Sequence, residues 1–128
     1  MSLTVPDFSA VNVLTVGDLM LDQYWFGPTS RISPEAPVPI VNIQGAEARA
    51  GGAANVAINL ARLGVKASLV GIAGDDTNHD KLRDLLAEQD IDADIVKSAD
   101  RPTITKLRVL SQNQQLVRLD TESVFDID

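Results

Sequence analysis

The stretch that decides the fold is GGAANVA, residues 51–57. Two adjacent glycines allow positive backbone φ and let another molecule approach the backbone closely. The following residues form an apolar helical stripe, and Gly64 is a natural residue to end that helix. A loop that opens a helix directs free N–H groups and the positive end of the helix dipole outward. The sequence therefore indicates either a turn that packs a helix closely on a sheet or a loop that holds a hydroxyl-rich ligand beside Asn55.

The spacing of these residues resembles the first signature of the ribokinase-like (PfkB) carbohydrate kinases. The matching positions are Gly51, Gly52, Asn55, Ala57, Gly64 and Gly74. The resemblance implies an α/β fold in which the glycine pair and Asn55 bind sugar hydroxyls.

Composition excludes several classes of function. A net charge of −7 argues against a nucleic-acid partner, because phosphate binding needs clustered Lys and Arg. The chain has no cysteine and one histidine, so neither a disulfide framework nor a zinc site is expected. Its apolar runs are of strand length, and we expect no membrane contact and a cytoplasmic location. A dinucleotide-binding domain is disfavoured because G-x-G-x-x-G is absent.

A short apolar run, residues 11–16, is typical of a buried strand that ends at Gly17. The next residues, GDLMLD, resemble the turn of the same kinase family in which the last aspartate accepts hydrogen bonds from sugar hydroxyls. That position is Asp22, with Asp18 as a less direct candidate. The family often has asparagine where this chain has Met20. Without the resemblance, Asp22 would equally suit a helix cap or a turn.

Aromatic residues at 24–26 precede a proline-rich segment, residues 31–41. Proline removes a donor from a strand ladder, so this segment is expected to be an edge or an extended arm with a strand starting near Val38. The segments GDLMLDQYWFGPT and SRISPEAPVPIV closely resemble the sequences of the heptose 7-phosphate kinases, a branch of the family. In ribokinase-like enzymes, strands inserted at this place form a β-lid over the sugar and often contribute to a dimer contact. Residues 42–50 are expected to return the chain to the body.

The middle of the chain indicates a βαβ unit. Residues 67–73 form a nearly continuous apolar run, typical of a strand covered on both faces. Asp76 is expected to cap the following helix rather than to bind a metal, and His79 is expected to be solvated on its polar side. Residues 91–96 indicate a further strand.

The last unit indicates a hairpin, with strands at 103–110 and 115–120 joined across a polar turn. Since side chains alternate along a strand, Lys106 and Arg108 should project from one face. Two neighbouring cations could clamp a phosphate monoester, or they could be a charged solvent face.

Residues 1–128 are thus expected to be the N-terminal portion of a ribokinase-like kinase, an incomplete layered α/β sheet with a β-lid at about 23–44 and 102–120. The family's Gly-Ala-Gly-Asp motif, which supplies the catalytic base, does not occur in these residues. The resemblance implies ATP and Mg²⁺ as cofactors of a larger parent enzyme, no catalytic residue here, and no activity of this chain alone. We expect residues 1–10 to be frayed and 125–128 to lack regular structure.

The resemblance implies phosphorylation of the C1 hydroxyl of D-glycero-D-manno-heptose 7-phosphate, a precursor of the lipopolysaccharide core, by a homodimer paired through the lid. The substrate would be held by Asp22, Gly51, Gly52, Asn55, Lys106 and Arg108. Two alternatives remain: a fragment of another PfkB-type sugar kinase, and a non-catalytic dimerisation or binding module that pairs through exposed sheet edges.

Overall fold

The structure is a computed structural model that describes residues 4–124 and 126. The expectations for residues 1–3, 125 and 127–128 therefore lie outside the described residues. The helices are α1 (Ala53–Arg62) and α2 (Thr77–Ala87). The strands are β1 (Asn12–Val16), β2 (Leu19–Phe26), β3 (Thr29–Ile32), β4 (Pro39–Val41), β5 (Gly45–Gly52), β6 (Lys66–Gly74), β7 (Asp92–Ser98), β8 (Ile104–Ser111) and β9 (Gln114–Thr121).

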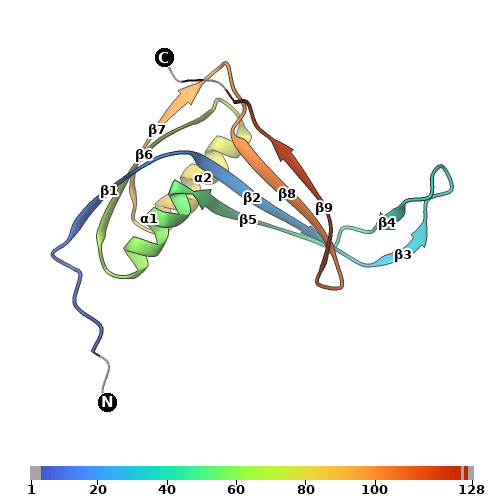
Figure 1. Cartoon of the computed structure of the whole chain (residues 1–128), viewed down its shortest axis with the longest axis horizontal. Coiled ribbons are helices and arrows are strands. Elements are labelled where there is room, and N and C mark those ends of the chain that lie inside the picture. Colours follow the sequence, from blue (N-terminus) through green and yellow to red (C-terminus); the bar gives the residue numbers. More distant parts are fainter. Residues whose placement is uncertain (1–3, 125, 127–128) are drawn as a thin grey trace.

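A parallel sheet of order β1-β6-β7 forms the body of the molecule (Figure 1). Both crossovers run in the same direction across this sheet, so right-handed connections put α1 and α2 on the same face. The packing agrees, because Ile58 of α1, Leu82 of α2 and Leu69 of β6 belong to one buried cluster. The opposite face carries exposed apolar side chains, including Leu14, Val16 and Val96.

A second sheet of order β5-β2-β8-β9, called the outer sheet below, extends away from the body (Figure 1). Strand β2 pairs antiparallel with β5 and parallel with β8, and β8 pairs antiparallel with β9. The β8–β9 hairpin was predicted, and its turn residues Gln112 and Asn113 have φ of 49° and 65°. Positive φ at both central residues is the geometry of a two-residue hairpin turn.

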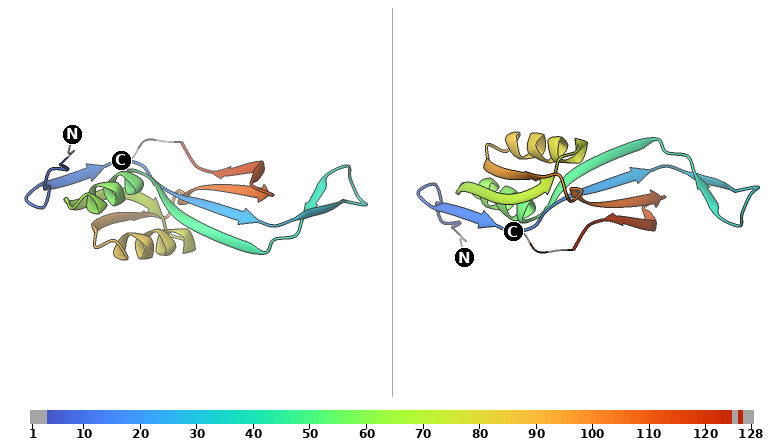
Figure 2. Two further views of the ribbon diagram at one scale, coloured as in Figure 1. Left: turned by 90° about the horizontal axis from the view of Figure 1, so that it is seen from below. Right: turned by 90° about the horizontal axis from the view of Figure 1, so that it is seen from above.

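The proline-rich segment forms an arm beyond the outer sheet, as the sequence predicted. Strands β3 and β4 pair with each other as a two-stranded sheet, and Pro39 begins β4. Figure 2 shows this arm at the end of the molecule farthest from the helices. The arm is therefore a protrusion rather than part of either larger sheet.

The predicted helix boundaries are confirmed by backbone geometry. Gly52 caps the start of α1 with φ 59°, and Gly64 follows its end with φ 91°. The amide of Gly64 donates to the Ala61 carbonyl at 2.9 Å, and that of Val65 donates to the Leu60 carbonyl at 3.1 Å. These bonds satisfy carbonyls that the helix end leaves free, which is the reason glycine suits this position.

Asp76 caps α2, as predicted, by accepting from the amides of Asn78 and His79 at 3.1 and 3.0 Å. The prediction that His79 is solvated was wrong. Its side chain is buried at 4% relative exposure, and its Nδ1 lies 3.2 Å from Oδ1 of Asp80. The polar residues around His79 in the sequence suggested an exposed side, but α2 contacts strands of both sheets, β2 and β5 as well as β6 and β7.

Two further expectations are corrected. Residues 45–52 were expected to be a return segment and a loop, but they form strand β5, the edge of the outer sheet beside β2. Asp22 was expected in a turn, but β2 begins at Leu19 and Asp22 lies inside that strand. In both cases, long-range pairing between β2 and β5 decides a structure that local composition did not indicate.

Within the part of the chain that the structure describes, neither helix is long and apolar enough to cross a membrane.

Candidate functional site

The side chains of β2 alternate between the two faces of the outer sheet. Leu19 and Leu21 are fully buried towards the helices, and Gln23 on the same side donates to Asn78 of α2 at 3.1 Å. Because alternate residues point to opposite faces, Asp22 and Tyr24 project from the other side. This second side is called the polar face below. Its residues are Asp22, Tyr24, Glu47, Arg49, Gly51, Lys106, Arg108, Arg118 and Asp120.

An ion pair joins two of the predicted site residues on this face. Nη1 of Arg108 donates to Oδ1 of Asp22 at 2.6 Å, and both side chains are about four-fifths buried, at 20% and 19% exposure. The hydrogen bond to Asp22 raises the pKa of the Arg108 guanidinium, against the opposing effect of burial. A short, charge-assisted bond between two mostly buried side chains fixes the carboxylate in orientation. The structure therefore brings together residues that are 86 positions apart.

Gly51 lies directly against this carboxylate. A Cβ placed on Gly51 would overlap Oδ2 of Asp22 and lie 2.7 Å from Cγ of Met20. Thus Oδ1 of Asp22 is occupied by Arg108, while Oδ2 lies over the glycine backbone. The oxygen over Gly51 is the one positioned to accept a hydrogen bond from a ligand that approaches this surface.

Lys106 lies on the polar face beside Arg108, as the alternation rule predicted, but it is already paired. Its Nζ lies 3.3 Å from Oδ2 of Asp120 and 4.0 Å from Oε2 of Glu122. Burial opposes ionisation of Asp120, but hydrogen bonds from Arg118 and Lys106 outweigh it and lower the pKa of that carboxyl. A phosphate that bound here would compete with these acids.

Asn55 and Gly52 lie nearer the body than the ion pair does. Gly52 ends β5, and Asn55 is exposed in the first turn of α1. Asn55 lines a hollow of about 450 Å³ with Ala48 and Ile58 on the helix side of β5, not on the polar face. The structure thus groups Asp22, Gly51, Lys106 and Arg108 on one surface, and it places Asn55 on the other side of β5.

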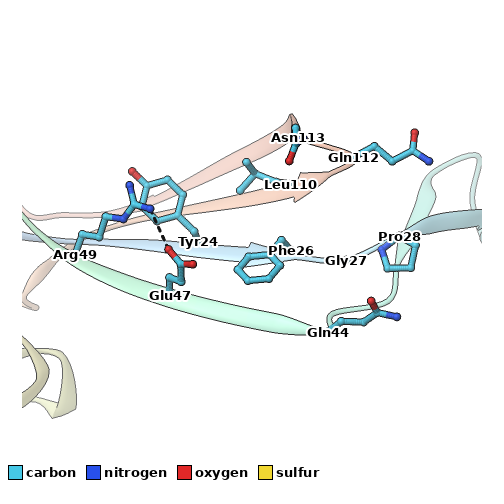
Figure 3. Close-up of a pocket in the computed structure, with 10 residues that line it drawn as sticks. All are labelled: Tyr24, Phe26, Gly27, Pro28, Gln44, Glu47, Arg49, Leu110, Gln112 and Asn113. Atoms are coloured by element: carbon cyan, nitrogen blue, oxygen red, sulfur yellow. Dashed lines mark hydrogen bonds and ion pairs between the residues drawn. The ribbon is translucent and has the colours of Figure 1, made fainter.

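Sequence reasoning missed the residues on the outer part of the polar face. A hollow of about 500 Å³ begins at Tyr24, Glu47 and Arg49 and runs towards the arm at Pro28 (Figure 3). Tyr24 could have been found by counting two residues on from Asp22 along a strand. Arg49 could not, because β5 was not predicted.

A metal site is not supported by the residues present. Among residues 4–124 and 126, no group of three or more His, Cys, Asp or Glu is arranged to hold a metal ion. Asp75, the acid that precedes Asp76 in the sequence, has its Oδ1 2.9 Å from Nζ of Lys97. These residues do not fit Mg²⁺.

The chain matches a known protein family over most of its length. The profile described as pfkB family carbohydrate kinase matches residues 11–124. The chain belongs to this family. The match covers every element from β1 to β9, so the outer sheet and its polar face are part of the family domain.

Among curated relatives, the chain is 58% identical to the bifunctional protein HldE of Proteus mirabilis over 125 residues, covering 98% of this chain and 26% of the relative. It is 59% identical to the bifunctional protein HldE of Sodalis glossinidius over 126 residues, with the same coverages, 98% and 26%. The chain therefore spans about a quarter of the length of these relatives.

Among solved structures, a carbohydrate kinase from Agrobacterium tumefaciens matches with a TM-score of 0.72 at 20% identity, over 86% of this chain and 35% of that one. Phosphofructokinase-2 from Escherichia coli in complex with fructose-6-phosphate matches with a TM-score of 0.68 at 24% identity, over 89% and 37%. These similarities confirm the predicted fold class, a partial ribokinase-like α/β domain with a protruding β-sheet.

Proposed function

We propose that this chain is the sugar-recognition part of an ATP-dependent kinase that phosphorylates the C1 hydroxyl of D-glycero-D-manno-heptose 7-phosphate. The observation that carries the proposal is the Asp22 carboxylate, held by Arg108 above Gly51 on the polar face of a pfkB-family chain. A carboxylate fixed beside open backbone accepts hydrogen bonds from sugar hydroxyls. The close sequence resemblance to heptose 7-phosphate kinases supports the choice of sugar.

In this proposal the chain binds and orients the sugar, and the general base lies elsewhere in the parent protein. Asp22 and the backbone at Gly51 and Gly52 hold hydroxyls, and Lys106 and Arg108 meet the 7-phosphate. ATP and its Mg²⁺ would be held by other parts of the parent kinase. Positioning of the acceptor supplies much of the rate enhancement in such reactions. We expect residues 1–128 alone to turn over no ATP, which a coupled ADP assay with heptose 7-phosphate would check.

The direct test is calorimetric titration of the chain with heptose 7-phosphate, ribose and fructose. We expect heptose 7-phosphate to bind more tightly than the other two sugars because only it offers a phosphate to Lys106 and Arg108. Tighter binding of ribose or fructose would instead favour another sugar kinase of the same family. In a larger kinase that contains these residues, the product phosphate should appear on C1 by phosphorus NMR.

Removing the cations of β8 should separate their roles. Lys106→Ala is expected to lower the affinity for heptose 7-phosphate about tenfold or more, because one charged hydrogen bond is lost. The affinity for unphosphorylated heptose should not change. Arg108→Ala should lower the affinity for both sugars, because Asp22 also loses its partner. The loss should be larger for the phosphorylated sugar. Titration of each variant with both sugars measures this. Equal losses for the two sugars in Lys106→Ala would contradict the phosphate clamp.

A second role, dimerisation through the outer sheet, is favoured by a separate observation. The back of this sheet, opposite the polar face, exposes Trp25, Val117 and Leu119 at 41%, 45% and 54%. Exposed apolar patches of this kind often mark contacts between proteins. We propose that a second copy covers this patch. Analytical ultracentrifugation should show a concentration-dependent dimer that Trp25→Lys dissociates, and a monomer at all concentrations would contradict it.

A further inference from the structure

The ring of Tyr24 lies between two guanidinium groups on the polar face. Cζ of Arg49 lies 4.8 Å from the ring centroid, and Cζ of Arg108 lies 5.2 Å from it. The three residues come from adjacent strands, β5, β2 and β8. Contact with an aromatic ring stabilises a cation and limits the conformations of its long side chain. The ring therefore holds two like charges near each other, an arrangement that a bound anion would stabilise.

Of these two cations, Arg49 is the more available to a ligand. Its ion-pair partner, Oε2 of Glu47, lies 3.0 Å away, and the two side chains are 65% and 53% exposed. An exposed pair of this kind contributes little and is easily exchanged for another anion. Arg108 is instead committed to Asp22 by one nitrogen, Nη1. A guanidinium has further N–H donors that remain for a second acceptor.

The position of the pair matches the two ends of a phosphorylated sugar. Asp22 and Tyr24 are two residues apart on β2, so their side chains are separated by about 6.6 Å along the strand. The hydroxyl-binding oxygen of Asp22 faces Gly51, on the body side, while Tyr24 opens into the outer hollow (Figure 3). A sugar whose ring lies at Asp22 would thus extend its phosphate towards Tyr24. This step rests on the proposed function.

We propose that Arg49, held against Tyr24, is a specificity-determining residue that binds the substrate phosphate together with Arg108. Tyr24 is a positioning residue that keeps both guanidinium groups directed at the same anion. The phosphate site then spans three strands rather than β8 alone. Arg49 of β5 then contributes to the discrimination between a phosphorylated and an unphosphorylated sugar.

The test is titration of the full chain and its variants with heptose 7-phosphate and with unphosphorylated heptose. Arg49→Ala is expected to weaken heptose 7-phosphate about tenfold or more, with the affinity for unphosphorylated heptose unchanged. Tyr24→Leu should lower the affinity for heptose 7-phosphate by a smaller factor. Tyr24→Phe, which keeps the ring, should have the affinity of the unsubstituted chain. Arg83→Ala is the matched control, since Arg83 is an exposed arginine on α2 paired with Asp80 and Asp84.

The slope of log affinity against log salt gives a second readout. For heptose 7-phosphate the slope should become shallower in Arg49→Ala, because one fewer charge meets the phosphate. In Arg83→Ala the slope should equal that of the unsubstituted chain.

The outcomes separate this inference from the proposed function. If the unsubstituted chain prefers the phosphorylated sugar and Arg49→Ala keeps that preference within twofold, the role of Arg49 is overturned and the proposed function stands. If Arg49→Ala weakens both sugars equally, the residue supports the fold rather than the phosphate, and the inference is again overturned. If the unsubstituted chain binds neither sugar, or binds both alike, the proposed function fails and the inference fails with it.

Discussion

Replacing Gly51 by alanine is expected to abolish sugar binding, with a loss of affinity of at least a hundredfold. The added Cβ would overlap Oδ2 of Asp22, the oxygen proposed to accept hydroxyl hydrogen bonds, and would lie 2.7 Å from Cγ of Met20. The carboxylate must therefore move, and its 2.6 Å bond to Arg108 must be broken or distorted. The methyl group would also fill the space above the backbone that the sugar needs. Overpacking of this kind costs about 1–3 kcal/mol of stability.

Gly64→Ala provides the matched control. Gly64 has φ 91°, so alanine is strained there, but no atom lies within 4 Å of the added Cβ. That variant should lose about 1 kcal/mol of stability through its backbone and keep the affinity for sugar. Thermal unfolding and calorimetric titration of both variants measure the two effects. Gly51→Ala with unchanged sugar affinity would show that ligands do not bind over this glycine.

The elements that local chemistry controls were predicted well. Gly64 ends α1, Asp76 starts α2, and the two strands of the β8–β9 hairpin meet at a turn with positive φ. Each of these signals acts over a few residues, where the conformation of a glycine, a cap or a turn dominates. The apolar run at 67–73 lies within β6, the central strand of the parallel sheet.

The candidate site was predicted in its residue types but not in its geometry. Asp22 and Arg108 were each identified, yet nothing local showed that β2 and β8 are parallel neighbours, which makes them an ion pair. Arg49 was missed because β5 contains glycine and alanine and little that favours a strand. Its pairing with β2 depends on tertiary context. His79 was misplaced for the same reason, since long-range contacts determine which side of α2 is covered.

Replacing Asp76 by alanine is expected to cause a large loss of stability, about 2–4 kcal/mol from the helix cap and the charge-assisted bonds together. Besides capping α2, Asp76 accepts from the Thr103 amide at 2.8 Å and from its hydroxyl at 2.7 Å. Thr103 is 1% exposed, and its Oγ1 accepts from the Gly74 amide at 3.0 Å. One carboxylate therefore joins the end of β6, the start of α2 and the segment that leads into β8. Its loss should loosen the outer sheet from the body.

The same contacts give this prediction a pH dependence. Burial raises the pKa of Asp76, but hydrogen bonds from Thr103, His79 and Asn78 outweigh it, so the folded pKa lies below the ordinary 3.8. A carboxyl with a lowered folded pKa stabilises the protein above its unfolded pKa, and this contribution disappears as the pH falls through the folded pKa. The stability difference between the unsubstituted chain and Asp76→Ala should thus be full at pH 7 and shrink below about pH 4.

Denaturant unfolding at several pH values measures that difference, with Asp75→Ala as the control. Asp75 precedes Asp76 but pairs on the surface with Lys97, at 62% and 49% exposure. Its removal should therefore cost no more than about 1 kcal/mol. Hydrogen exchange adds a spatial readout, because only Asp76→Ala should speed exchange at the start of β8 and in the first turn of α2 together. If Asp76→Ala matches Asp75→Ala in both stability and exchange, the Asp76 carboxylate does not couple the outer sheet to the body, and other contacts hold them together, such as the packing of Leu19 and Leu21 and the Gln23–Asn78 bond.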